Sequence, residues 1–315
     1  MSPPAERFGV LLMTYGSPAS LDDVKRYMTA VRNGREPEED LVTEFRRRYQ
    51  VIGGSPLVAI TQAQAAALEE CLGGRAVVRA GMRFSSPTIT DSLRELRDAG
   101  VSRVVAIVMS PQFSELLMGG YSRALAAARG EMGDRAPEIH LAGAWHLETA
   151  FIDALAGRIA QGLAQFPADD RDSVPVLLTA HSLPHRIAEQ EPGYIAQLRA
   201  TANAVARAAD LGAERWRFCW QSAGHEPGEW MKPDFADLMP ELAADGHHTV
   251  LVAPVQFLAD HLEILYDVDI GAREQASAAG LDFRRIDSLN VEPRFIDALG
   301  SVALATTKAS VAGVP

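Results

Sequence analysis

Cysteine is almost missing from this sequence, which has only Cys71 and Cys219 among its 315 residues. The two are too far apart to form a CxxC motif, and two thiolates are too few to hold an iron–sulfur cluster. We therefore expect no iron–sulfur cluster. We interpret each cysteine as a small core residue or an inert thiol.

Positive charge is also scarce. Thirty Lys and Arg residues stand against 41 Asp and Glu residues, which gives a net charge of −11 and argues against general binding of nucleic acid. No apolar run approaches the ~20 residues of a membrane helix, and the first residues lack the pattern of a signal peptide. GxGxxG and Gly-Lys-Ser/Thr phosphate loops are absent as well. These absences predict a cytoplasmic protein without a transmembrane segment.

What the sequence does contain is an alternation of short apolar runs with helical patterns. Such continuous Val/Leu/Ile runs between helices are typical of parallel strands that are buried on both faces. The pattern predicts an α/β protein with two similar doubly wound, Rossmann-like domains. The expected strands are 8–14, 76–82, 103–110, 138–144, 174–180, 215–221, 248–255 and 281–287. The expected helices are 20–32, 86–100, 122–132, 148–166, 193–212, 234–246, 260–277 and 292–307.

An internal repeat supports two domains. "VLLMTYGSP" at 10–18 returns as "VLLTAHSLP" at 176–184, so that Tyr15 aligns with His181 at an offset of 166. "AIVMSPQF" at 106–113 returns as "VLVAPVQF" at 250–257, at an offset of 144. The distance between the two repeated segments is thus 22 residues longer in the first half than in the second.

We predict three parts from this repeat: an N-terminal α/β domain, a C-terminal α/β domain and a last helix that packs back on the first domain. Their ranges are 1–146, 147–290 and 291–315, and the surplus lies at about 33–57 as an insertion. Ligands of such sheets bind beyond the carboxyl ends of the strands, where both echoes fall. We therefore expect a cleft between the domains, lined by Tyr15 and His181.

Two polar residues at these strand ends could carry chemistry. His181 closes an apolar strand, and its imidazole could accept a proton, bind a metal or serve as a core residue. Glu263 could complete a capping box with Asp260, because the two stand three residues apart. Alternatively, Asp260, Glu263 and Asp267 share one helix face and form an acidic row suited to a divalent cation.

The insertion is basic within an acidic protein, with Arg32, Arg35 and Arg46–Arg48. The pattern indicates either an exposed basic helix face or a patch for carboxylates, since arginine binds carboxylates in a bidentate manner. The glycine turn "IGGSP" that follows presents Ser55 as a possible donor.

Together the motifs "LLMTYGSP", "YQVIGGSPL", "SPQFS", "TAHSLP" and "VQFLADHLEILYD" resemble those of the ferrochelatases. These enzymes are lyases that insert Fe²⁺ into a porphyrin during haem biosynthesis. The similarity runs from about residue 8 to the last helix. Tyr15 in "MTYGSP" is similar to the coproporphyrin III branch, whereas the protoporphyrin branch typically carries "NLGTP" there. The resemblance thus implies insertion of Fe²⁺ into coproporphyrin III to give coproheme.

The resemblance also implies roles for individual residues. His181 and Glu263 match the Fe²⁺-handling catalytic pair, and Tyr15 matches a tyrosine that is an axial ligand of iron in the product. Asp267 continues the acidic row as a possible metal ligand. The implied substrate-binding residues are Tyr15, Arg32, Arg48, Tyr49, Ser55 and Tyr121.

Two departures from the family pattern stand out: one residue is missing between the glycine pair and Ser55, and Gly271 replaces an acid at the end of the acidic row. The alternatives are a protoporphyrin IX ferrochelatase, a cobalt or nickel chelatase and a non-catalytic haem or porphyrin carrier. We expect a monomer with no permanently bound cofactor and with Fe²⁺ as substrate. A downstream coproheme decarboxylase is the implied partner.

Overall fold

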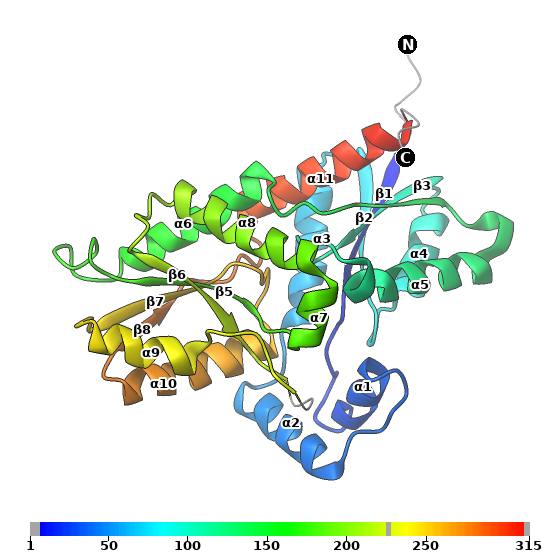
Figure 1. Ribbon diagram of the computed structural model, residues 1–315. Helices are drawn as coiled ribbons and strands as arrows, with labels where there is room; N and C mark the ends of the chain where they lie inside the picture. The colour runs from blue at the N-terminus through cyan, green and yellow to red at the C-terminus, as the bar shows by residue number, and fades with distance from the viewer. Residues whose placement is uncertain (1–6, 225–227, 312–315) are drawn as a thin grey trace. The chain divides into compact units, whose positions relative to one another are not determined.

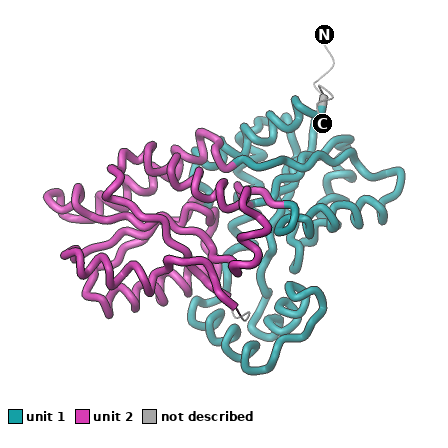
Figure 2. The backbone as a smooth tube through the Cα atoms, viewed as in Figure 1, with its two compact units in different colours: residues 1–109, 115–145, 290–315 teal, residues 110–114, 146–289 magenta. Residues whose placement is uncertain are grey.

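The computed structural model describes residues 7–224 and 228–311, which divide into two compact units. The first is built from residues 7–109, 115–145 and 290–311, and the second from 110–114, 146–224 and 228–289 (Figure 2). The short segment 110–114 therefore packs with the second unit although its neighbours on both sides belong to the first. The C-terminal stretch from residue 290 packs with the first unit.

The first unit contains a four-stranded parallel sheet with the order β2-β1-β3-β4 (Figure 1). Its strands are β1 (Phe8–Thr14), β2 (Ala76–Met82), β3 (Arg103–Val108) and β4 (Glu138–Leu141). Its helices are α1 (Val24–Val31), α2 (Glu39–Val51), α3 (Leu57–Cys71), α4 (Ile89–Asp98), α5 (Glu115–Met132), the 3₁₀ turn Gly133–Arg135 and α11 (Pro293–Val311).

Helices cover both faces of this sheet. On one face α4 and α5 pack against alternate residues of the strands, among them Leu11, Met13 and Val104. On the other face α3 and α11 contact each other and the strands. Every residue of β1 is buried, as expected for a strand inside a doubly wound sheet.

The second unit repeats this arrangement with the order β6-β5-β7-β8. Its strands are β5 (Val176–His181), β6 (Trp216–Gln221), β7 (Thr249–Pro254) and β8 (Asp282–Arg285). Its helices are α6 (Thr149–Leu163), α7 (His185–Gln190), α8 (Pro192–Ala208), α9 (Phe235–Ala244), a π-helix Glu263–Ala272 (η2) and α10 (Arg273–Ala278). The predicted fold class of two similar doubly wound units with parallel sheets is confirmed.

Several predicted boundaries were wrong. The first helix begins at Val24 rather than at Ser20, because the carboxylate of Asp23 accepts a hydrogen bond from Ala19 N–H and pairs with Arg26 before the first helical turn. The helix expected at 122–132 begins at Glu115. The helix expected at 260–277 is a π-helix joined to a short α-helix. Sequence patterns assigned no helix to α2, α3 or α7.

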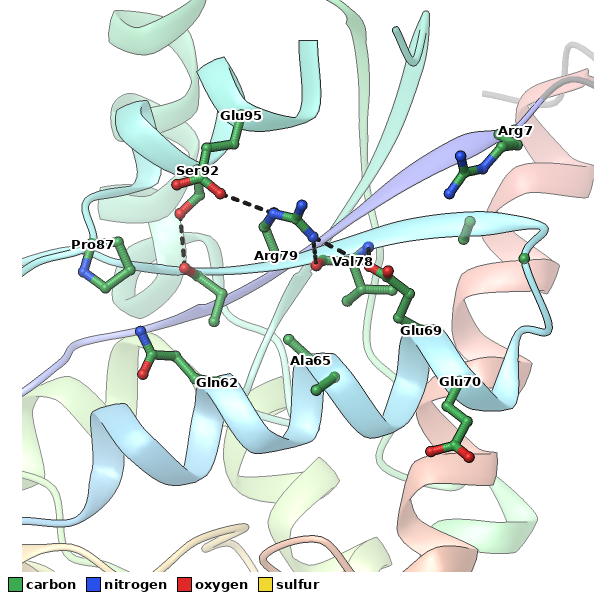
Figure 3. Close-up of a pocket in the computed structure, with 14 residues that line it drawn as sticks. Arg7, Gln62, Ala65, Glu69, Glu70, Val78, Arg79, Pro87, Ser92 and Glu95 are labelled. Atoms are coloured by element: carbon green, nitrogen blue, oxygen red, sulfur yellow. Dashed lines mark hydrogen bonds and ion pairs between the residues drawn. The ribbon is translucent and has the colours of Figure 1, made fainter. Parts of the chain in front are cut away.

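The outer strand β2 has its free edge covered by side chains (Figure 3). The N–H of Val78 donates to the Glu69 carboxylate at 2.7 Å, and the Arg79 guanidinium donates to Val78 O at 2.7 Å. Ser92 Oγ donates to Ala80 O at 2.8 Å. The groove of about 760 Å³ that runs along this edge contains none of the predicted site residues.

Replacing Glu69 by Leu should destabilise the first unit. Val78 is only 3% exposed, so its N–H would lose its partner with limited access to water. Leaving a buried donor unpaired costs about 1–3 kcal/mol. Urea denaturation should show this loss, while Glu70→Leu on the exposed side of α3 should have little effect. Equal stability of the two variants would contradict the role given to Glu69.

Candidate functional site

Tyr15 follows the carboxyl end of β1 in a loop that is tightly fixed. Tyr15 O accepts a hydrogen bond from Phe84 N at 3.0 Å, and Tyr27 Oη donates to Gly16 O at 2.9 Å. Gly16 has a φ of 87°, and a Cβ there would lie 2.1 Å from Ser85 Oγ, so only glycine fits. The chain therefore presents Tyr15 in one orientation, with 44% of the residue exposed.

The ring of Tyr15 rests on an aromatic cluster. It stacks on Tyr121 with ring centroids 5.9 Å apart and meets Phe84 edge-on at 5.3 Å. The Arg83 guanidinium lies 4.6 Å from the Phe84 ring centroid and 5.7 Å from each tyrosine ring centroid. A Cβ at Gly120 would lie 2.0 Å from Arg83 Cζ, so this glycine makes room for the cation. Such cation–π contacts hold the rings in place.

Two of the predicted substrate-binding tyrosines, Tyr49 and Tyr121, are almost completely buried. Tyr121 is 5% exposed, and its phenol pKa is raised well above the usual value, mainly by burial. Tyr49 is 6% exposed within α2. Tyr121 thus supports the ring of Tyr15 from behind.

The polar side chains of the insertion differ in their surroundings. Arg32 is exposed at the end of α1, and its guanidinium has no ion-pair or hydrogen-bond partner among the described residues. Arg48 donates to the Glu44 carboxylate at 2.8 Å, and Arg47 binds the same carboxylate. These two hydrogen bonds lower the pKa of Glu44 to about 2. Ser55 is half-buried, and its Oγ accepts a long hydrogen bond of 3.4 Å from Leu57 N–H.

In the second unit, His181 is the last residue of β5. Its backbone N–H donates to Gln256 Oε1 at 2.7 Å, and its Nδ1 lies 2.5 Å from Ser182 O. Because Ser182 N–H also donates to Gln221 O on β6, the chain stays extended past the histidine. Nδ1 pointing at a carbonyl oxygen favours the tautomer with the proton on Nδ1, which leaves Nε2 as an acceptor.

Glu263 stands between two histidines. Its Oε2 lies 3.6 Å from His181 Nε2 and 3.8 Å from His261 Nε2, and its side chain is 35% exposed. Burial raises the pKa of Glu263, but the two imidazoles outweigh it and bring the pKa to about 2. In His261, burial lowers the pKa, and the nearby carboxylate of Glu263 more than compensates and raises it. A carboxylate that stays ionised next to an imidazole can bind a cation or relay protons.

Glu263 opens the π-helix η2, and the predicted capping box is absent. Asp260 lies before the helix, where its carboxylate accepts from Ser288 Oγ at 2.6 Å and lies 3.5 Å from Arg285. Arg285 also binds Asp269 in a bidentate manner at 2.7 and 2.9 Å. Asp260 is therefore not part of the acidic row. Instead, it helps fix η2 to β8. π-Helical turns are rare in proteins, and those that occur often lie at functional sites.

The rest of the acidic row is short. Asp267 lies close enough to His261 for its charge to contribute to that raised pKa. Gly271 contributes no carboxylate to the last turn of η2. Within residues 7–224 and 228–311, no three His, Cys, Asp or Glu side chains converge in a group that could hold a metal ion. The same residues include no helix with the length and apolarity needed to cross a membrane.

Comparison with known proteins decides the family. The sequence model of the ferrochelatases matches residues 7–307, nearly the whole chain. The chain belongs to the ferrochelatase family. It is thus an enzyme, a metal chelatase of the lyase class, as the sequence motifs predicted.

Individual relatives also support membership of this family. The chain is 39% identical to a ferrochelatase of Deinococcus radiodurans, over 93% of this chain and 94% of that protein. It is 36% identical to a coproporphyrin III ferrochelatase of Geobacillus kaustophilus, over 94% of this chain and 95% of that protein. Among solved structures, SirB of Bacillus subtilis with Fe³⁺ superposes with a TM-score of 0.60 at 11% identity, over 97% of this chain and 98% of that one. That last likeness shows the chelatase fold.

Sequence reasoning missed three residues that contact the predicted site residues of this ferrochelatase family member. They are Arg83, which contacts the rings around Tyr15, His261, which lies beside Glu263, and Gln256, which binds the backbone of His181. Each follows a strand or stands inside a quoted motif, so its position relative to the strand end was the available signal. The contacts of Arg83 with Tyr15 and of Gln256 with His181 join segments that are far apart in sequence, which no local pattern reveals, whereas His261 stands only two residues before Glu263.

Proposed function

We propose that this enzyme inserts Fe²⁺ into coproporphyrin III and releases coproheme. The observation that carries the subtype is Tyr15, an exposed phenol that its own loop and three neighbouring side chains hold in place. A fixed phenol is suited to be an axial ligand of iron. A relative that acts on coproporphyrin III, at 36% identity, supports the same reading.

The proposed iron chemistry belongs to His181 and Glu263. Metallation replaces two pyrrole N–H protons by one Fe²⁺, so two protons must leave for each metal that enters. Nε2 of His181 accepts the two pyrrole protons one after the other, and each leaves to solvent before the next is taken up. The ionised Glu263 at 3.6 Å stabilises the imidazolium that forms each time. Imidazole and carboxylate are also suitable Fe²⁺ ligands, and two such ligands bind weakly enough to pass the metal on. Asp267 is proposed to extend this path outward.

The proposed contacts to the porphyrin carboxylates come from the insertion. Coproporphyrin has four propionates and protoporphyrin has two, so a rim rich in arginine favours the former. Arg32 is the stronger candidate because its guanidinium is unpaired among the described residues, whereas Arg48 already binds Glu44. We propose that Ser55 adds a hydroxyl donor, that Tyr49 supports this surface from within α2, and that Tyr121 supports the ring of Tyr15.

Protoporphyrin IX is the second candidate substrate. The relative from Deinococcus radiodurans is named simply a ferrochelatase and is as similar to this chain as the coproporphyrin enzymes are. An anaerobic absorbance assay with Fe²⁺, run in parallel on coproporphyrin III and protoporphyrin IX, separates the two. Faster metallation of coproporphyrin III is the expected result. Faster metallation of protoporphyrin IX would overturn the subtype, and a rate seen only with Co²⁺ or Ni²⁺ would overturn the metal.

Replacing Arg32 by Ala should weaken coproporphyrin binding. A charged hydrogen bond contributes about 1.5–3 kcal/mol, and exposure favours the lower end, so KM should rise roughly 10-fold with kcat nearly unchanged. Steady-state rates over a range of coproporphyrin concentrations measure this. Arg207→Ala at the exposed end of α8 is the matched control and should leave KM unchanged. An unchanged KM in Arg32→Ala would remove Arg32 from the proposed rim.

Four further expectations stay predictions from the sequence. They are hand-over of the product to a coproheme decarboxylase, a monomeric state, a cytoplasmic location and the lack of a permanently bound cofactor.

The two cysteines are free thiols. Cys71 Sγ lies 3.6 Å from Asp297 Oδ1, and Cys219 is fully buried.

A further inference from the structure

In the sheet of the second unit, β5 extends further at its carboxyl end than its neighbour β7. The last pair between β5 and β7 is Thr179 with Pro254, after which Val255 N–H donates to Thr179 O at 3.1 Å. β7 then ends, while β5 continues to His181. The backbone N–H of His181 would therefore face the missing end of β7. The side chain of Gln256 takes this place, with Oε1 accepting that N–H at 2.7 Å.

Gln256 is itself fixed from the other side. Its Nε2 donates to Tyr194 Oη at 2.7 Å, and Tyr194 on α8 is only 4% exposed. A single amide thus joins the backbone of His181 to a buried phenol. Both functions of the amide are used, one as acceptor and one as donor.

The same face of α8 holds a second segment. Tyr194, Gln197 and Thr201 are three and four residues apart and so share one side of the helix. Gln197 exchanges two hydrogen bonds with the backbone of Phe113, at 2.8 and 3.1 Å, and Thr201 Oγ1 accepts from Gln112 Nε2 at 2.9 Å. Both "QF" segments of the internal repeat are therefore anchored to α8, within one unit. The helix provides a rigid reference for them.

We propose that Gln256 is a positioning residue that holds His181 in place for metallation, with α8 as its support through Tyr194. This inference depends on the proposed role of His181. The imidazole is carried by a strand end that has lost its backbone partner on one side, so its position depends on the Gln256 amide. A displacement of about 1 Å at a reacting group can cost about 100-fold in rate.

Three substitutions separate the parts of this link. Gln256→Leu keeps the approximate volume and removes both hydrogen bonds. Gln256→Glu keeps both, because a carboxylate accepts from His181 N–H and from Tyr194 O–H, which turns to donate. Tyr194→Phe removes only the support from α8. Gln275→Leu, on the exposed side of α10, is the matched control.

The expected result is a loss of kcat rather than of binding. Gln256→Leu should lower kcat by roughly 10- to 100-fold with the KM for coproporphyrin III within about two-fold. Hydrogen exchange of the His181 amide should become faster in Gln256→Leu than in the parent. Gln256→Glu should restore the slow exchange and most of kcat, and Tyr194→Phe should fall between the parent and Gln256→Leu.

Wild-type kcat in Gln256→Leu would overturn the inference, and so would unchanged exchange of the His181 amide. If Gln256→Leu fails to fold, the other two variants decide. Tyr194→Phe with parental kcat and parental exchange would count against the link, and a lower kcat with faster exchange of the His181 amide would support it. His181→Ala, measured in the same assay, keeps the two proposals apart. Full activity there would refute the role of His181, whereas an inactive His181→Ala beside a fully active Gln256→Leu would refute only the positioning.

Discussion

His181→Ala should abolish metal insertion while the protein still binds porphyrin. The variant removes the group proposed to accept pyrrole protons, and a positioned general base typically contributes 10²–10⁴-fold, so kcat should fall by at least about 100-fold. The porphyrin should still shift its Soret band on addition of the protein, because the proposed carboxylate contacts lie on other residues. Single-turnover absorbance under anaerobic conditions measures both quantities.

The matched control for this variant is His185→Ala. That imidazole stands at the start of α7, is 55% exposed and pairs with Glu189 at 3.8 Å. Its loss should leave the rate unchanged. A fully active His181→Ala would refute the assignment of His181 as the proton acceptor. An equal loss of rate in both variants would show that removal of any nearby imidazole is harmful.

Glu263→Gln should have the second largest effect. The substitution keeps the size of the side chain and removes the charge that lies within 4 Å of two imidazoles. We expect kcat to fall by roughly 100-fold, because the imidazolium that forms in the reaction loses its counter-charge. The pKa of Glu263 is about 2, so the carboxylate is ionised throughout the working range of pH. Its own titration should therefore not appear in a rate profile between pH 5 and 9.

The same variant tests the electrostatics without catalysis. The nearby carboxylate of Glu263 raises the pKa of His261, against the lowering effect of burial. Removing that charge leaves burial to dominate, so the pKa of His261 should fall in Glu263→Gln. NMR titration of the histidine side chains measures the shift. Glu274→Gln on exposed α10 should leave it unchanged, and an upward shift in Glu263→Gln would reverse the proposed interaction.

Sequence patterns were sufficient for the fold class because each buried strand is a continuous apolar run. β1 and β5 were found to within two residues at each end, and the prediction of two similar doubly wound units with parallel sheets was correct. The equivalent strand orders of the two sheets were seen only in the structure. The helices α2 and α3 were not assigned. α2 is largely polar, and its apolar residues Val42, Phe45 and Tyr49 stand in a segment that was interpreted only as a basic insertion. α3 is rich in alanine along its length and shows no clear apolar stripe. The π-helix was also beyond reach, because its wider turn has no known pattern at a period of 3.6 residues.

Candidate residues could be placed from the sequence where a residue stands at a strand end or lies in a quoted motif. Tyr15 and His181 were identified in this way, and Glu263 was found through its motif. Asp260 was interpreted either as a helix cap or as part of an acidic row, yet it pairs with Ser288 and Arg285, which are 28 and 25 residues away along the chain. Contacts of that range are set by how the sheet and its helices pack, and the local sequence contains no record of them.

The covered edge of β2 has a consequence for how this chain behaves in concentrated solution. An open strand edge is a template on which another chain can add a strand, and such addition starts intermolecular aggregation. Here Glu69, Arg79 and Ser92 already occupy the Val78 N–H, the Val78 carbonyl and the Ala80 carbonyl, three hydrogen-bonding groups that a second chain would need. Substitutions that make this groove apolar to gain stability would therefore remove the side chains that cover the β2 edge. The more hydrophobic variant would then be the one that forms fibres.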